Sequence, residues 1–158
     1  MIALGDQNGG HMPRLDSAID IKAPREDVFK YVSDVESRPE WVKWTKRSVV
    51  TSEEPGTLGQ TDAGVMQVGP QKQQVEGIVT EYRDGQVFTR KHTRGMDLTD
   101  RVSVVPTPDG CKVAWSIEYT PPMGGMGKLL DLLFMVRLME QLQKDSLDIL
   151  KLRLETAR

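Results

Sequence analysis

Three side chains that could move a proton lie in two strand-like segments of the chain. Arg90 and His92 belong to the segment 86–94, and Tyr119 stands near the end of the segment 111–120. A histidine titrates near neutral pH, and an arginine can hold a carboxylate or an enolate. If these three side chains faced one cavity, they would be candidate catalytic residues.

The alternative for the first segment is an ordinary solvated surface. Arg90 and His92 share their strand face with Phe88 and Arg94, while Val87 begins the opposite face. A strand face with two arginines is usually solvated, because charged side chains are rarely buried without partners. We therefore favour an outward orientation for this face and keep the catalytic interpretation as the alternative.

The segment 111–120 offers an apolar face that could contact a ligand. Strict alternation puts one set of side chains on the inward side of the expected strand. That set is Cys111, Val113, Trp115, Ile117 and Tyr119. Trp115 and Tyr119 could stack on a ligand, and the alternative is a closely packed core.

Two more tryptophans, Trp41 and Trp44, flank a turn and lie three residues apart. One of them could close the entrance of a cavity. We favour the alternative, in which they form a hydrophobic plug beneath short helices.

Residues that would hold a metal or a cofactor are not arranged in any known spacing. The chain has two histidines, His11 and His92, and the single cysteine Cys111. Neither a zinc pattern nor a disulfide framework can be built from them. Asp97, Asp100 and Asp109 are scattered acids without the paired spacing of acid–base hydrolysis. We expect no metal and no cofactor.

Composition excludes several classes of function. The 158 residues are 38% hydrophobic and 28% charged, with a formal net charge of −2. This balance argues against a general nucleic-acid binder. No apolar stretch reaches the length of about 18 residues that a membrane span needs, so we expect no stable membrane insertion. We expect a cytoplasmic protein that is a monomer or a weak dimer.

The first residues look unlike the rest of the chain. Gly10-His11-Met12 resembles a cloning junction, and the preceding stretch has no apolar block typical of a secretory signal. We expect 1–11 to be a disordered leader and 12–158 to form one ligand-binding domain.

Hydrophobic periodicity and turn residues divide the remaining chain into elements. A strand at 14–23 precedes a helix at 24–33 and a helical turn at 35–42 that Pro39 should break. Then follow six strands, at 45–53, 59–68, 72–83, 86–94, 97–106 and 111–120, and one long helix from Lys128 to about Ala157. Turn signals between the six strands predict an antiparallel meander.

This order of elements predicts an α+β fold with a hollow interior. A sheet of about seven strands is much wider than one helix, which is roughly 10 Å across. The sheet must therefore curve around the C-terminal helix, with the two short helices after strand 1 at its side. Curved sheets tend to leave a cavity between the layers, where a ligand can bind.

The first half of the long helix, Leu129–Met139, is apolar on nearly all sides. It is either simple core, the lining of a pocket mouth, or a transient contact with a membrane or a protein. Together with the aromatic residues above, it completes the candidate ligand-binding set: Trp41, Trp44, Phe88, Val113, Trp115, Ile117, Tyr119, Leu130, Leu133, Phe134, Met135 and Leu138.

Four features resemble the START-like, or SRPBCC, superfamily, which includes the polyketide cyclase/dehydrase and lipid-transport family. They are the strand and helix at 19–34, the turn Arg38-Pro39-Glu40-Trp41-Val42-Lys43-Trp44, the strand Val113-Ala114-Trp115-Ser116-Ile117-Glu118-Tyr119, and the glycine-rich loop before the last helix. The resemblance covers about 14–156. It implies a helix-grip fold and brings no single catalytic motif to transfer.

We therefore expect a domain that binds or transports a hydrophobic small molecule, such as a lipid, an isoprenoid or a polyketide-like compound. The first alternative is an enzyme of the polyketide cyclase or aromatase type, with Arg90, His92 or Tyr119 moving protons. The second is an interaction module or chaperone of the coenzyme Q-binding type. The missing catalytic motif makes binding without catalysis the favoured interpretation.

Overall fold

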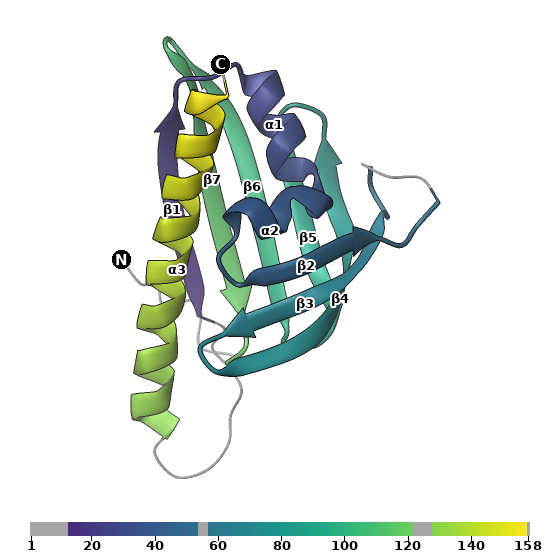
Figure 1. Cartoon of the computed structure of the whole chain (residues 1–158), viewed down its shortest axis with the longest axis vertical. Coiled ribbons are helices and arrows are strands. Elements are labelled where there is room, and N and C mark those ends of the chain that lie inside the picture. Colours follow the sequence, from purple (N-terminus) through teal and green to yellow (C-terminus); the bar gives the residue numbers. More distant parts are fainter. Residues whose placement is uncertain (1–12, 54–56, 122–127, 158) are drawn as a thin grey trace, which may run out of the picture.

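A computed structural model describes residues 13–53, 57–121 and 128–157, with the side chains of 128–130 outside the description. The suspected leader at 1–11 lies outside the described residues. The elements are β1 (Arg14–Ile21), α1 (Arg25–Ser33), the 3₁₀ turn η1 (Val35–Ser37), α2 (Arg38–Trp41), β2 (Thr45–Val50), β3 (Thr61–Val68), β4 (Gln71–Arg83), β5 (Val87–Arg94), β6 (Leu98–Thr107), β7 (Gly110–Tyr119) and α3 (Lys128–Thr156), as Figure 1 shows.

The seven strands form one antiparallel sheet in the order β1-β7-β6-β5-β4-β3-β2. The strands β2 to β7 follow one another as the meander that the turn signals predict. The first strand pairs with the last, with Leu15 opposite Ile117 and Ile21 opposite Cys111. This long-range pairing places the chain's first strand at one edge of the sheet and β2 at the other.

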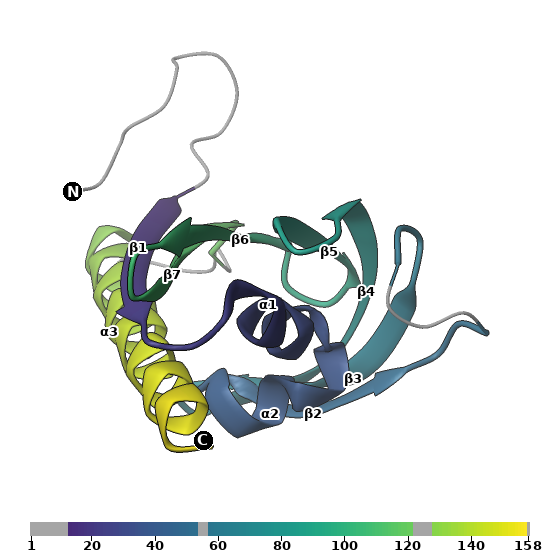
Figure 2. The ribbon, with the colours of Figure 1, turned by 90° about the horizontal axis from the view of Figure 1, so that it is seen from above.

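The sheet curves strongly, and the helices lie on its concave side. Seen from above, α1 and α2 lie inside the curve, and α3 covers the opening near β1 (Figure 2). Side chains from both layers, among them Phe29, Val113 and Met139, form a single buried hydrophobic cluster. The expected helix-grip arrangement, with a long C-terminal helix and two short helices after strand 1, is confirmed.

The turn at 35–42 differs in detail from the expectation. Pro39 does not break it, because Pro39 lies in the first turn of α2, where its missing N–H costs nothing. The Asp34 side chain accepts a hydrogen bond from the backbone N–H of Glu36 and so starts η1. Two short helical turns therefore follow one another and end at Trp41.

Polar side chains anchor the second half of α3 within an otherwise apolar stripe. Met139, Leu147 and Leu150 are fully or almost fully buried. Between them, Gln143 Nε2 donates to the carbonyl of Trp115 at 2.9 Å. The backbone N–H of Lys43 donates to Ser146 Oγ at 2.9 Å. These two bonds fix α3 against β7 and against the turn that carries the tryptophans.

Among the described helices, none is long and apolar enough to cross a membrane.

Candidate functional site

Three tryptophans form the centre of the concave side. Trp41 ends α2, Trp44 stands just before β2, and Trp115 projects inward from β7. The rings of Trp44 and Trp115 stack with centroids 5.2 Å apart, and the rings of Trp41 and Trp115 are tilted at 5.1 Å. All three are at most 2% exposed. We call them the tryptophan cluster; their position fits the plug interpretation, and direct contact with a ligand stays a prediction.

The predicted inward face of β7 is buried along its whole length, with Val113, Ile117 and Tyr119 fully enclosed. The cross-strand register carries this face onto neighbouring strands, since Trp115 lies opposite Val102 and Val102 lies opposite Phe88. Phe88 is also buried. The apolar candidates from β5 and β7 therefore belong to one continuous inner surface.

Tyr119 has a buried hydroxyl without a hydrogen-bond partner among the described residues. Burial and, to a smaller extent, the carboxylate of Glu140 on α3 together raise the pKa of Tyr119 to about 12. The phenol therefore stays protonated at neutral pH. The indole N–H groups of Trp41 and Trp115 are likewise buried and lack a partner within the described part of the chain. All three groups can donate a hydrogen bond to an incoming acceptor.

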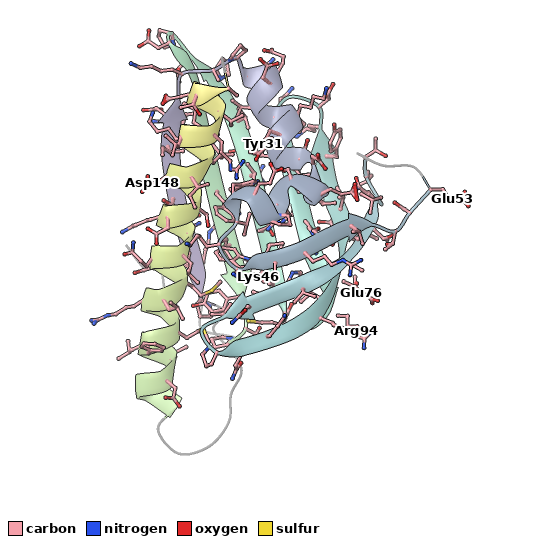
Figure 3. The ribbon with its side chains drawn as sticks, in the orientation of Figure 1. Tyr31, Lys46, Glu53, Glu76, Arg94 and Asp148 are labelled. Atoms are coloured by element: carbon pink, nitrogen blue, oxygen red, sulfur yellow. The ribbon has the colours of Figure 1, made fainter. Side chains whose placement is uncertain are left out.

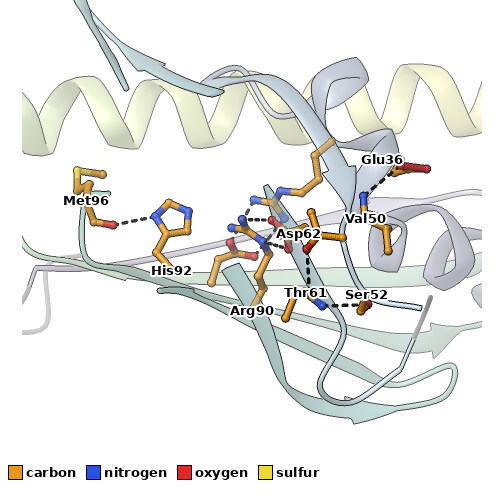
Figure 4. Close-up of polar contacts among 11 residues, drawn as sticks. Glu36, Val50, Ser52, Thr61, Asp62, Arg90, His92 and Met96 are labelled. Carbon is orange, nitrogen blue, oxygen red and sulfur yellow. Dashed lines mark hydrogen bonds and ion pairs between the residues drawn. The ribbon is translucent and has the colours of Figure 1, made fainter. Parts of the chain in front are cut away.

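The other half of the concave side carries charges. Arg90 on β5 is 4% exposed, and its guanidinium reaches across β4 to Asp62 on β3, with Nε donating to Oδ2 at 2.8 Å (Figure 4). Gly77 makes this reach possible, because a Cβ at Gly77 would lie 2.5 Å from a guanidinium nitrogen of Arg90. Burial disfavours the charge of Arg90, but the hydrogen bonds and charge of Asp62 outweigh it, so the pKa of Arg90 is raised.

A second buried pair lies beside the first. Arg38 on α2 donates to both carboxylate oxygens of Asp100 on β6, at 3.3 and 3.1 Å. The Arg38 side chain is 2% exposed and the Asp100 side chain 0%. Burial lowers the pKa of Arg38, against the opposing charge of Asp100. We call Arg38, Asp62, Arg90 and Asp100 the ionic network.

His92 lies next to this network and is neutral. Burial and, to a smaller extent, the positive charge of Arg90 together lower the pKa of His92 to about 4. Its Nδ1 lies 2.7 Å from the carbonyl of Met96, which can only accept, so Nδ1 carries the proton (Figure 4). The neutral ring therefore leaves Nε2 as a hydrogen-bond acceptor. A cavity of about 10 Å³, the space of one water, is lined by Arg90, His92 and residues of the neighbouring strands.

The expected outward orientation of Arg90 and His92 is wrong, and that of Arg94 is right. The Arg94 side chain is 63% exposed and lies near Glu76 on the outer surface (Figure 3). The expectation failed because it counted arginines without their partners. Asp62 and Asp100, which neutralise the two buried arginines, come from other strands. Because Arg90 is already paired and His92 is neutral, neither matches a charged catalytic group in this state.

The candidates on α3 divide into two groups. Met135 and Leu138 are half-buried and pack against the core. Leu133 and Phe134 are 48% and 68% exposed, which excludes simple core for these two and fits a pocket mouth or a contact surface. The side chain of Leu130 lies outside the description. Ligand contact by any of them stays a prediction.

No group of three metal-binding side chains occurs among the described residues. The described part of the site is an apolar and aromatic interior with three donors that lack a partner within it and two buried ion pairs. Such an interior can bind and orient an apolar molecule, whereas proton transfer would have to involve the neutral His92 or the protonated Tyr119.

Comparisons with solved structures show which proteins share this architecture. A START superfamily protein from Mycobacterium smegmatis superposes with a TM-score of 0.74 at 15% identity, over 92% of this chain and 99% of that one. The Zhui aromatase/cyclase from Streptomyces sp. R1128 gives a TM-score of 0.78 at 11% identity, over 92% and 94%. The di-domain aromatase/cyclase StfQ of the steffimycin biosynthetic pathway gives 0.73 at 15% identity, over 91% of this chain and 51% of that one.

These likenesses establish the fold, and a family match adds the family. No curated protein matches the chain. Residues 12–155 match the family described as polyketide cyclase / dehydrase and lipid transport. The chain belongs to the polyketide cyclase/dehydrase and lipid transport family, and it shares its fold with the START superfamily protein.

Proposed function

We propose that the protein binds a hydrophobic small molecule between the inner surface of the sheet and the first half of α3. The observation that carries this proposal is the buried Tyr119 hydroxyl without a partner among the described residues. A buried hydroxyl left unpaired costs about 1–3 kcal/mol, and a ligand carbonyl or ether oxygen would remove that cost. The expected ligand is therefore mainly apolar and carries at least one acceptor.

The adaptable side chains around this end of the interior favour ligand entry there. Met96, Leu132, Met135 and Leu138 are half-buried and pack against the core without being enclosed by it. Methionine is flexible and polarizable, so it can adjust to different apolar shapes. Exposed Leu133 and Phe134 continue the apolar surface outward along α3. A ligand could thus pass from this surface to Tyr119 by displacing these flexible, half-buried side chains.

Burial of apolar surface would supply most of the free energy of the proposed binding. A ligand that buries about 250 Å² of apolar surface gains about 6 kcal/mol at 25 cal/mol per Å². Immobilising the ligand offsets part of this gain. A hydrogen bond from Tyr119 would add about 1 kcal/mol and orient the molecule. These two contributions supply about 7 kcal/mol before the cost of immobilisation, so we expect a ligand of this size to bind more weakly than micromolar and a larger apolar ligand to bind more tightly.

An enzyme of the cyclase or aromatase type is the second candidate. It is favoured by the inward position of Arg90 and His92 and by the aromatase/cyclases among the structural neighbours. Against it, Asp62 already pairs Arg90, and the pKa of His92 at about 4 makes this ring a weak base at neutral pH. Binding without turnover is therefore the stronger proposal.

Tryptophan fluorescence provides a direct test, because all three tryptophans of the chain form one buried cluster. We expect 2-acetylnaphthalene and 2-ethylnaphthalene, which differ in one acceptor, both to change this emission saturably. Tyr119→Phe should weaken the ketone about fivefold and the hydrocarbon less than twofold. Tyr31→Phe, which removes a hydroxyl bonded to Glu40 instead, is the matched control. No saturable change with either compound, or equal effects of both variants, would contradict the proposal.

A further inference from the structure

A second cavity, of about 580 Å³, lies between α1 and the far ends of β2 and β4. We call it the α1 cleft and define it by its apolar floor, Phe29, Val50 and Tyr82, and by the charged residues described below. None of its lining residues belongs to the tryptophan cluster or the ionic network, and Tyr119 is not among them. Figure 2 shows α1 inside the curve of the sheet, facing β4. Its volume falls within the range of about 300–1,000 Å³ typical of small-molecule sites.

Two aromatic rings form the floor of the α1 cleft. Phe29 from α1 and Tyr82 from β4 have ring centroids 5.7 Å apart and are tilted by 60°. Phe29 is 2% exposed, so it is held firmly, whereas Tyr82 is half-buried. Burial raises the pKa of Tyr82, and Asp84 raises it further, so the ring remains a neutral phenol. A neutral aromatic face attracts both apolar rings and cations.

The charged residues of the α1 cleft give it a negative balance. Four carboxylates line it, from Glu26, Asp34, Glu36 and Asp84, against two basic side chains, so its formal charge is −2. Asp34 and Glu36 each accept a backbone N–H, from Glu36 and Val50 respectively. Backbone bonds hold these two carboxylates in place without neutralising them.

One of the two basic side chains is already engaged. Arg25 pairs with Glu26 at 3.4 Å. The Arg25 guanidinium also lies 3.9 Å from where a Cβ on Gly85 would be, so it closes one end of the cleft against the turn after β4. Lys30 is the other basic residue of the lining. After the pair of Arg25 and Glu26 is set aside, three carboxylates face one lysine.

We infer that the α1 cleft is a second binding site, for a small organic cation with an apolar or aromatic body. The ring of the ligand packs on Phe29 and Tyr82, and its ammonium group lies toward the carboxylates. The cavity and its aromatic floor indicate a site, and the charge balance selects the sign of the ligand. The site differs in place and in ligand chemistry from the interior site proposed above.

Three probes of similar size separate charge from shape: protonated phenethylamine, neutral 2-phenylethanol and anionic phenylacetate. Backbone amide shifts of the full chain, followed by NMR at neutral pH, locate and quantify binding. We expect phenethylamine to shift amides at 25–36 and 82–85 and to bind at least threefold more tightly than either other probe. Equal affinity for the three probes, tighter phenylacetate, or shifts absent from these segments would overturn the inference.

Matched variants test the charge itself. Asp84 is exposed on the turn after β4, so Asp84→Asn should leave the fold intact. It should weaken phenethylamine about threefold, the size expected for one exposed charge, and the loss should shrink in high salt. Asp109→Asn, the same change on the exposed turn after β6, is the control and should have no effect. An equal loss in both variants would overturn the assignment.

The aromatic floor has its own variant. Tyr82→Leu keeps an apolar side chain but removes the ring, and it should weaken phenethylamine about fivefold. Tyr119→Phe should leave phenethylamine unchanged, and Asp84→Asn should leave 2-acetylnaphthalene unchanged. The proposal for the α1 cleft and the proposal for the interior site can therefore be contradicted independently of each other. A phenethylamine affinity that falls with Tyr119→Phe and not with Tyr82→Leu would contradict a separate cleft site.

Discussion

The tryptophan cluster and the ionic network lie on the same concave side, yet different forces hold them. Trp41, Trp44 and Trp115 stack through apolar and aromatic contacts, which are non-directional and adapt to small changes. The ionic network depends on specific partners, since each arginine is buried only because a carboxylate meets it. The first region should therefore tolerate conservative changes, whereas the second should fail when one partner is lost.

The largest effect is expected from breaking one buried pair. Asp100→Ala leaves the charged Arg38 without its carboxylate in a site that is 2% exposed. Uncompensated buried charge costs about 4 kcal/mol of unfolding free energy. Urea denaturation measures the loss. The double variant Arg38→Met/Asp100→Leu should recover most of it, and equal instability of the single and double variants would show that pairing is not the cause.

The pH dependence of stability sharpens the same contrast. His92 has a pKa of about 4 in the folded protein, against 6.5 ordinarily. Between these two values the unfolded chain binds a proton at His92 that the folded protein does not bind. The contribution of His92 to the unfolding free energy is therefore fully present above about pH 6.5 and is lost as the pH falls to about 4. The shift corresponds to about 3 kcal/mol.

His92→Asn keeps an amide that can donate to Met96 and removes the titration. We expect the unfolding free energy of the native protein to fall about 3 kcal/mol further than that of the variant between pH 7.5 and pH 4. Urea midpoints at several pH values measure this difference. Parallel curves for the two proteins would mean that His92 does not titrate as described.

A smaller effect is expected in the aromatic region. Trp115→Phe keeps a ring that can stack on Trp44 and removes an indole N–H that has no partner among the described residues. The remaining void should cost about 2 kcal/mol. Thermal or urea unfolding checks the value. A loss as large as that of Asp100→Ala would contradict the expected tolerance of this region.

An exposed ion pair should show the smallest effect. A guanidinium nitrogen of Arg94 lies 3.8 Å from a carboxylate oxygen of Glu76 on the outer surface, and the two side chains are 63% and 50% exposed (Figure 3). Glu76→Gln should change the unfolding free energy by less than about 0.5 kcal/mol. A loss above about 2 kcal/mol in the same urea assay would show that burial is not what distinguishes the ionic network from this pair.

The sequence predicted the order of elements because its signals are local. Turn residues and alternation separate the strands, and the inward face of 111–120 follows from period two alone. The ionic network was missed because it joins α2, β3, β5 and β6, and its register cannot be read from any one segment. One signal was present: Asp100 alternates with Leu98, Val102 and Val104, all buried in β6. An acid on an apolar strand face predicts a buried basic partner.

The role of Gly77 could not be predicted for the same reason. A glycine inside a strand can mark a bulge or a close approach of another group. The pairing of Gly77 with His92 and the path of the Arg90 side chain over Gly77 show that a close approach occurs here. The candidate ligand residues were likewise chosen by hydrophobicity, which does not separate enclosed Ile117 from exposed Phe134. The hydrophobic pattern identifies which side chains are apolar, and tertiary packing decides which of them are buried.

Native mass spectrometry of the protein purified from its natural source tests the central claim, the binding of a hydrophobic small molecule, most directly. We predict that part of the protein carries an added mass that organic solvent releases, and that the released compound is apolar with at least one oxygen acceptor. A bare chain mass, together with failure to retain any compound from a panel of lipids, isoprenoids and polyketide-like molecules, would contradict ligand binding in the interior.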